Sequence, residues 1–266
     1  MLHSIADLMR ETAAGELLPR FRALAAHEIE EKSPGDVVTV ADRAAEDRLT
    51  RGLRDIVPGC TVIGEEAAHG DPGLLDRLGE DGPVFVVDPL DGTANFAAGR
   101  PEFAVMIALL RKGRPVAAWI YDPLGRNVLM AEEGGGTTLN GEIRRLPESP
   151  ALAEARGSAQ TRFLEEPWRG RLDAARHRFR DLGSTLCAGH DYLRLIQGRM
   201  DFLLYWRTLP WDHAPGALIV AEAGGHVARP DGRPFVCDRA SRGILSALDE
   251  SLWHRVRAAL LPHLGT

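Results

Sequence analysis

Apolar positions in the first 56 residues recur at helical spacing. Residues 1–31 are rich in Ala, Leu, Glu and Arg, which predicts one or two amphipathic helices interrupted near Gly15 and Pro19. A polar loop is expected at 32–36. A second helix is expected over 42–56, because a Pro-Gly pair follows it.

Short apolar runs then predict a series of strands. The run at 84–87 is continuous rather than alternating, which is typical of a strand buried on both faces. The segment 67–82 is rich in Gly and Asp and predicts a surface loop with a helical turn. Residues 134–136 (Gly-Gly-Gly) and 140–141 (Asn-Gly) have the composition of hairpin turns. The expected strands are 60–63, 84–87, 103–110, 115–121 and 127–131.

The character of the sequence changes after Pro147. From there, helical and strand patterns alternate as far as a C-terminal helix near 249–261. We therefore expect an N-terminal α+β subdomain over 1–147 and a C-terminal α/β subdomain over 148–266. This mixture indicates a layered architecture rather than a barrel or a bundle.

Composition excludes several classes of protein. With 38 acidic residues against 32 Lys and Arg, the net charge is −6, which argues against a nucleic-acid-binding surface and a polybasic membrane patch. The longest apolar run, Phe103–Leu110, has eight residues and is too short to span a bilayer. The N-terminus lacks a signal-peptide pattern, and the three cysteines are widely spaced. We expect a cytoplasmic enzyme with reduced thiols and no nucleic-acid or membrane partner.

Four carboxylates occupy positions where an apolar strand gives way to a turn or a helix: Glu65, Asp88, Asp91 and Asp212. Ligand-binding groups concentrate at such strand ends. Converging carboxylates repel one another unless a cation neutralises them, and a set of hard oxygen ligands favours Mg²⁺. The backbone amides of Gly92 and Thr93, which follow Asp91, would donate hydrogen bonds to a phosphate oxygen. Carboxylates, Mg²⁺ and phosphate together predict a phosphomonoesterase.

Each motif also has an ordinary structural explanation when it is taken alone. A single Asp-Pro-x-Asp-Gly is usually a turn, and Gly-Glu-Glu is usually a solvated strand end. Asp212 has the position of a helix N-cap. The sequence pattern by itself leaves both explanations open.

Taken together, the motifs resemble those of the inositol monophosphatase family. The resemblance rests on Gly64-Glu65-Glu66, on the run 86–96 (VVDPLDGTANF) and on the run 211–216 (WDHAPG). Further matches in the expected order cover nearly the whole chain, including the 32–42 segment. Three spaced motifs in order are far more specific than any one of them.

The resemblance implies a fold, a mechanism and a set of roles. The fold would be a layered αβαβα sandwich similar to fructose-1,6-bisphosphatase and inositol monophosphatase. The protein would form a homodimer, and Li⁺ would inhibit it. Two or three Mg²⁺ would be held by Glu65, Asp88, the Leu90 carbonyl, Asp91, Thr93 and Asp212. Asp42, Thr93 and Glu65 would be the catalytic residues. The substrate would contact Lys32, Gly92, Thr93, Gly183, Ser184, Thr185, Tyr205 and Arg207.

One departure from the family pattern concerns the substrate. Inositol-specific members carry a glutamate seven residues before the second-signature aspartate, and here that position is Tyr205. Losing a carboxylate acceptor weakens selection of a polyol. Tyr205, Trp206 and Arg207 would suit an aromatic, cationic or more highly phosphorylated substrate, or they simply pack a strand.

Several functions therefore remain open. The first candidate substrate is an inositol monophosphate-like ester. Histidinol phosphate, 3′-phosphoadenosine 5′-phosphate and fructose 1,6-bisphosphate are the alternatives in the same class. A regulatory binding protein of the same fold, and a metal-dependent sugar-phosphate enzyme without hydrolysis, belong to other classes. Intact metal ligands argue against a purely regulatory binding protein. The lack of a covalent nucleophile argues against a sugar-phosphate enzyme without hydrolysis.

Overall fold

Seven strands in the first half of the chain form one large sheet. The computed structural model describes residues 1–33, 36–160, 163–164, 166–238 and 242–261. Strands β3 and β4 are parallel, and every other neighbouring pair in this sheet is antiparallel. In spatial order the strands are β3 (Thr61–Gly64), β4 (Val84–Asp91), β5 (Ala104–Arg111), β6 (Arg114–Asp122), β7 (Asn127–Glu132), β8 (Gly136–Leu139) and β9 (Glu142–Arg144).

The five strands expected from apolar runs are confirmed, and so are the two glycine-containing turns. Gly134, Gly136 and Gly141 all have positive φ, as tight hairpin turns require. Strand β4 is longer than expected, because it continues through Pro89 to Asp91 with a register shift between Asp88 and Asp91. Residues 65–79 are more helical than expected: α3 (Glu65–Gly70) is followed by 3₁₀ turns at Pro72–Gly79, which the Asp71 side chain caps.

Two helices near the N-terminus cover the outer face of the large sheet. These are α1 (Leu2–Thr12), extended by a π-helical turn at Ala13–Leu17, and α2 (Val40–Ile56). Thr39 caps α2 and exchanges hydrogen bonds with Asp42 in a capping box.

The expectation of helix as far as residue 31 is wrong. Residues Ile29–Ser33 form strand β1, which pairs with β2 (Asp36–Thr39) in a two-stranded antiparallel ribbon. The polar loop expected at 32–36 therefore overlaps two strands, and residues 34 and 35 lie outside the described part of the chain. Backbone pairing with β2, a contact within the tertiary structure, decides the conformation of this segment.

The second half of the chain forms a smaller sheet with its own helices. The strand order is β11 (Asp181–Leu182), β10 (Arg156–Ala159), β12 (Phe202–Tyr205), β14 (Ile244–Ala247) and β13 (His226–Ala228). The helices are α5 (Trp168–Ala175), α6 (Ala188–Ile196), α7 (Pro210–Glu222) and α8 (Glu250–Leu260). Short 3₁₀ turns lie at Ala26–Glu28, Leu152–Glu154 and Arg176–Arg178, and the short helix α4 (Thr93–Ala97) follows β4.

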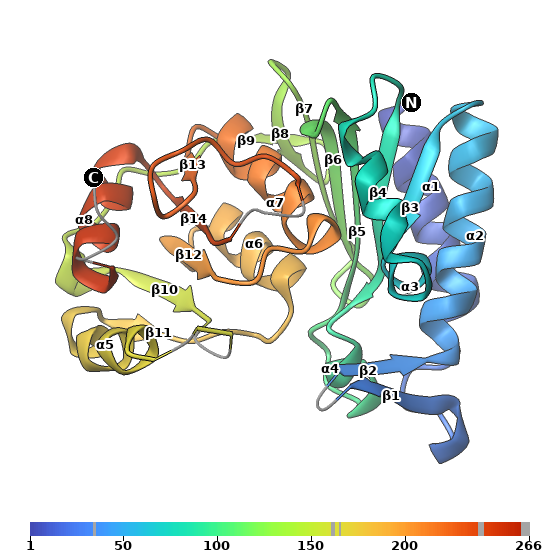
Figure 1. Cartoon of the computed structure of the whole chain (residues 1–266), viewed down its shortest axis with the longest axis horizontal. Helices are drawn as coiled ribbons and strands as arrows, with labels where there is room; N and C mark the ends of the chain where they lie inside the picture. Colours follow the sequence, from blue (N-terminus) through green and yellow to red (C-terminus); the bar gives the residue numbers. More distant parts are fainter. Residues whose placement is uncertain (34–35, 161–162, 165, 239–241, 262–266) are drawn as a thin grey trace.

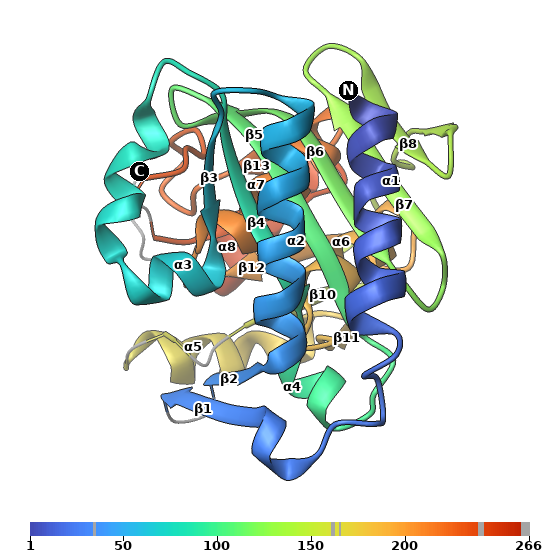
Figure 2. The same cartoon turned by 90° about the vertical axis from the view of Figure 1, so that its right-hand side faces the viewer.

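Figure 1 shows five layers from right to left, and Figure 2 shows α1 and α2 lying across the large sheet. Helices α1 and α2 are followed by the large sheet, then by α6 and α7, then by the small sheet, and finally by α5 and α8. The expected layered αβαβα sandwich is confirmed. Among the described residues, no helix combines the length and the apolar character needed to cross a membrane.

Helix α7 joins the two sheets. Most of its residues are buried, and it packs against β5, β6 and β7 of the large sheet and against β13 and β14 of the small one. At its C-terminal end, the Glu222 carboxylate accepts hydrogen bonds from the Gly134 and Gly136 amides, each at 2.9 Å. The expected boundary at residue 147 falls between β9 and β10, and the division into two subdomains stays a prediction.

Replacing Glu222 with Ala tests this junction. Removing the carboxylate leaves two turn amides without their acceptor, and hydrogen bonds to charged groups contribute about 1.5–3 kcal/mol. We expect E222A to lower the free energy of unfolding by about 2 kcal/mol in urea titrations. The matched control is E133A, since Glu133 is exposed in the same hairpin. Equal stability of the two variants would contradict the role assigned to Glu222.

Candidate active site

A cavity of about 250 Å³ opens where the end of β4 faces helices α6 and α7. Residues from both halves of the chain line it, so neither sheet forms it alone. Its walls are Val37, Glu65, Asp88, Leu90, Asp91, Gly92, Thr93, Ala94, Gln160, Phe163, Leu186, Cys187, Ala188, Tyr205, Trp206, Arg207, Leu209, Asp212 and His213.

The irregular end of β4 directs two carboxylates into this cavity. Residues three apart in a regular strand point to opposite faces. The register shift between Asp88 and Asp91 breaks that alternation, and the Leu90 amide donates to Asp88 Oδ1 at 3.0 Å. Gly92 ends the strand with φ 84°, and a Cβ there would lie 2.8 Å from the Glu102 carbonyl oxygen. Only glycine fits this conformation and this space.

The start of α6 holds Asp91 in place. Its Oδ2 accepts a hydrogen bond from the Gly189 amide at 2.6 Å and one from Cys187 Sγ at 3.0 Å. Both donors lie about 100 positions away in the sequence and carry no local motif. The sequence analysis assigns neither Cys187 nor Gly189 to the site, because only the tertiary fold brings α6 to β4.

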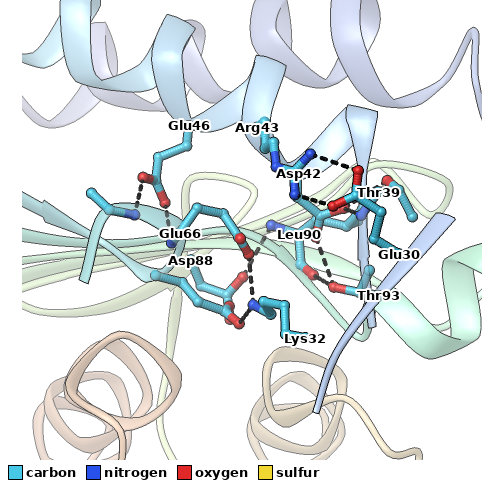
Figure 3. Close-up of polar contacts among 12 residues, drawn as sticks. Glu30, Lys32, Thr39, Asp42, Arg43, Glu46, Glu66, Asp88, Leu90 and Thr93 are labelled. Carbon is cyan, nitrogen blue, oxygen red and sulfur yellow. Dashed lines mark hydrogen bonds and ion pairs between the residues drawn. The ribbon is translucent and has the colours of Figure 1, made fainter. Parts of the chain in front are cut away.

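Thr93 and Asp42 form a buried polar pair beside the carboxylates (Figure 3). Thr93 Oγ1 lies 2.8 Å from Asp42 Oδ1 and 2.8 Å from the Leu90 carbonyl oxygen. The other oxygen of Asp42 accepts from the Thr39 amide at 2.8 Å and from the Thr39 hydroxyl at 2.6 Å. Burial raises the pKa of Asp42 to about 6 despite these donors.

Lys32 reaches the site from strand β1. Its Nζ lies 2.9 Å from Glu65 Oε1 and 2.8 Å from Glu66 Oε1, and its side chain is almost fully buried (Figure 3). Burial lowers the pKa of Lys32, but the two carboxylates outweigh this effect and raise it above its usual range. The ammonium therefore stays charged and offsets part of the negative charge of Glu65.

Glu46 supports this corner from helix α2. Its carboxylate accepts the amides of Glu66 and Ala67, each at 2.8 Å, at the start of α3 (Figure 3). A side chain at Gly64 would overlap the Glu46 carboxylate, so the glycine of the Gly-Glu-Glu motif makes room for it. Burial raises the pKa of Glu46 to about 7.

The electrostatics of the cavity favour a cation. Burial, followed by repulsion from Glu65, Asp91 and Asp212, raises the pKa of Asp88 well above its ordinary value. Burial and the charges of Glu65 and Asp91 do the same for Asp212, and burial raises the pKa of Glu65 to about 7. Carboxylates that repel one another around one cavity are the ligand set expected for a hard divalent ion.

The donor set therefore fits Mg²⁺ in its chemistry. Within the described ranges, no three carboxylate, imidazole or thiol side chains already surround one point as a preformed metal site. The Lys32 ammonium holds Glu65 in the present arrangement. The four carboxylates nevertheless line one cavity.

Tyr205 and His213 give another part of the lining a different character. The Tyr205 hydroxyl donates to Asp191 Oδ2 at 2.7 Å, so its polar tip points away from the cavity. His213 Nδ1 lies 3.3 Å from the Tyr192 hydroxyl, and its Nε2 lies 3.1 Å from the Arg207 carbonyl oxygen. Burial lowers the pKa of His213 to about 3, which keeps the imidazole neutral.

The substrate-binding residues expected from the sequence divide into two groups. Gly92, Thr93, Tyr205 and Arg207 line the cavity, and Lys32 contacts it through Glu65. Gly183, Ser184 and Thr185 lie outside its lining, where Ser184 and Thr185 donate to the buried Asp191. The next residues along the chain line the cavity instead: Leu186, Cys187 and Ala188. Sequence reasoning also missed Val37, Gln160, Phe163 and Leu209, which carry no motif.

The inositol monophosphatase family pattern matches residues 3–264 of the chain. A Thermotoga maritima protein named fructose-1,6-bisphosphatase/inositol-1-monophosphatase is 35% identical over 211 residues, 76% of each chain. Pseudomonas aeruginosa Nus factor SuhB is 36% identical over 225 residues, 81% of each chain. The solved Thermotoga maritima IMPase superposes with a TM-score of 0.81 at 28% identity, covering 98% of this chain and 96% of that one. The chain therefore belongs to the inositol monophosphatase family, as its motifs implied.

Proposed function

We propose that this protein is a Mg²⁺-dependent phosphomonoesterase that hydrolyses a small phosphate ester by means of an activated water molecule. Membership of the family supports a phosphatase. The observation that carries the proposal is the convergence of Glu65, Asp88, Asp91 and Asp212 on one cavity, beside the Asp42–Thr93 pair. This arrangement combines ligands for the cation with an acceptor for a proton.

Two or three Mg²⁺ would be held by the four carboxylates together with the Leu90 carbonyl and Thr93. When bound, the ions would polarise the phosphoryl oxygens and lower the pKa of a water molecule. Lys32 would then release Glu65 and keep its second partner, Glu66, which it contacts at 2.8 Å. Its charge would stay close to the phosphate.

The chain's own residues would orient the water and receive its proton. The Thr93 hydroxyl, while donating to Asp42, presents its lone pairs to the water. Asp42, with a pKa of about 6, has the proton affinity of a general base near neutral pH. The Gly92 and Thr93 amides would bind phosphate oxygens. The water oxygen would bond to phosphorus as the ester P–O bond breaks, the water's proton would pass to Asp42, and the leaving alkoxide would take a proton from solvent.

The proposed substrate is an inositol monophosphate-like ester. Histidinol phosphate, 3′-phosphoadenosine 5′-phosphate and fructose 1,6-bisphosphate remain alternatives, and the Thermotoga maritima relative is named for two activities. A regulatory role belongs to another class, and the Pseudomonas aeruginosa relative is named as a Nus factor. The buried, mutually repelling carboxylates favour catalysis, because pure binding gives no physical reason for them. We also propose that the protein is a homodimer located in the cytoplasm.

Replacing Asp91 or Asp212 with Asn tests the ligand set. Each change removes a negative ligand, so phosphate release from glycerol 2-phosphate at 5 mM Mg²⁺ should fall by at least about 100-fold, while the circular dichroism spectrum stays unchanged. E133A, which alters an exposed residue, serves as the matched control. Activity near wild type in D91N or D212N, or full wild-type activity in EDTA, would exclude this mechanism.

The raised pKa values predict how stability depends on pH. Because folding raises the pKa of Asp42 to about 6 and that of Glu65 to about 7, the folded state favours their protonated forms. In EDTA, their contribution to stability is complete below about pH 4 and is lost as pH rises through 6 to 7. Urea titrations should show this loss.

Mg²⁺ should oppose the loss of stability at higher pH, because it binds the ionised carboxylates. Ligand at 100 times its Kd stabilises a protein by about 2.7 kcal/mol. The Mg²⁺-induced rise in melting temperature should therefore be larger at pH 7.5 than at pH 5, and D212N should reduce it. An equal rise at both pH values would contradict the assignment of these carboxylates as ligands.

A further inference from the structure

Helix α2 carries two buried carboxylates that lie one turn apart. Asp42 and Glu46 are separated by four positions, which places them on the same face of the helix. Figure 3 shows both side chains on the side of α2 that faces the active-site segments, and both are buried. Acidic residues are rarely buried unless a partner holds them. Each of these two has its partner on a different segment of the chain.

The two carboxylates hold the ends of two neighbouring strands. Asp42 Oδ1 accepts the Thr93 hydroxyl at 2.8 Å, just after strand β4 ends. Glu46 Oε2 and Oε1 accept the amides of Glu66 and Ala67, each at 2.8 Å, just after strand β3 ends. Helix α2 is therefore attached to both strand ends that supply groups to the cavity from the large sheet.

Glu46 caps helix α3 in place of a local residue. The first amides of a helix have no acceptor within the helix, and the side chain of the N-cap residue usually supplies one. The N-cap of α3 is Gly64, which has no side chain to offer. A Cβ at Gly64 would lie 2.1 Å from Glu46 Cδ, so the absence of a side chain there is what lets the carboxylate approach.

The capped turn carries the side chains that matter for the site. Glu65 and Glu66 are the first two residues of α3, so the amides held by Glu46 set the direction in which both side chains leave the helix. Glu65 lines the cavity, and Glu66 binds the Lys32 ammonium. Four residues of helix rise about 6 Å, so α2 sets a fixed separation between its two points of attachment.

We propose that Glu46 is a positioning residue for the reaction, because by holding the first turn of α3 it fixes Glu65 relative to Thr93. The proposal rests on the phosphomonoesterase function proposed above, in which Glu65 is a ligand of the cation and acts with Thr93 on the water molecule. Glu46 lies outside the cavity lining, so it acts through Glu65 rather than on the substrate.

Replacing Glu46 with Gln tests this role at nearly constant size. The change puts an NH₂ donor against a backbone amide that also donates, so the first turn of α3 loses one acceptor. Removing a group that holds a metal ligand typically weakens metal binding by about 10–100-fold. We expect E46Q to raise the Kd for Mn²⁺ by about 10-fold, measured from the electron paramagnetic resonance signal of the free ion.

The same variant should separate kcat from KM. At saturating Mg²⁺, kcat for glycerol 2-phosphate should fall by about 10-fold, because Glu65 is displaced relative to Thr93. KM should stay within about 2-fold of the wild-type value, since Glu46 does not touch the ester.

Two variants on the same helix serve as controls. D55N changes an exposed carboxylate of α2 and should leave Kd and kcat at wild-type values. L53A removes buried apolar contacts near the far end of α2, so it should lower the urea midpoint while Kd and kcat stay unchanged. This second control separates positioning from a general loss of stability.

G64A tests the same contact from the opposite side. A methyl group at position 64 would push the Glu46 carboxylate off its two amides, so G64A alone should raise the Kd for Mn²⁺ as E46Q does. In an E46A background the methyl group has room, and adding G64A should change Kd by less than about 2-fold, because the two residues share one contact.

The outcomes separate this proposal from the function on which it rests. If the wild-type protein binds Mn²⁺ and hydrolyses the ester, an unchanged Kd and kcat in E46Q would overturn the role of Glu46 alone. Equal losses in E46Q and L53A, or additive effects of G64A and E46A, would overturn it as well. A wild-type protein that neither binds Mn²⁺ nor releases phosphate would overturn both proposals.

Discussion

Four carboxylates that line one cavity and repel one another are the constraint on which this structure is built. Bringing them together costs free energy, and contacts from the surrounding helices and strands offset part of that cost. Hydrogen bonds from the start of α6 hold Asp91, the irregular end of β4 turns Asp88 and Asp91 to one side, and Lys32 neutralises part of Glu65. These contacts keep the anionic side chains around one cavity, which suits the binding of a cation.

Helix α7 couples this set to the rest of the molecule. It carries Asp212 into the cavity from its first turn, packs along the large sheet, and ends with Glu222 fixed to the β7–β8 hairpin. Asp212 therefore keeps its position relative to β4 only while the two sheets stay joined through this helix. The site is a property of the whole sandwich rather than of either sheet.

The cavity also has a division of labour between its two ends. Carboxylates from the family motifs line one part, whereas another part includes Phe163, with the Arg207 guanidinium stacked over its ring. Asp191 connects them structurally, since it fixes the loop before α6 and turns the Tyr205 hydroxyl away from the cavity. In this chain, Tyr205 contributes a ring surface to the cavity lining.

The sequence alone determined five of the seven strands of the large sheet, helix α2 and the four carboxylates, because continuous apolar runs, capping residues and strand-end motifs are local signals. Tertiary structure decided the remainder. Residues 29–33 pair as a strand because β2 lies beside them. Leu186–Ala188, rather than Gly183–Thr185, line the cavity because Asp191 binds Ser184 and Thr185 underneath. Cross-strand pairing and a buried hydrogen-bonded carboxylate are long-range interactions, and they leave no periodic trace in the sequence.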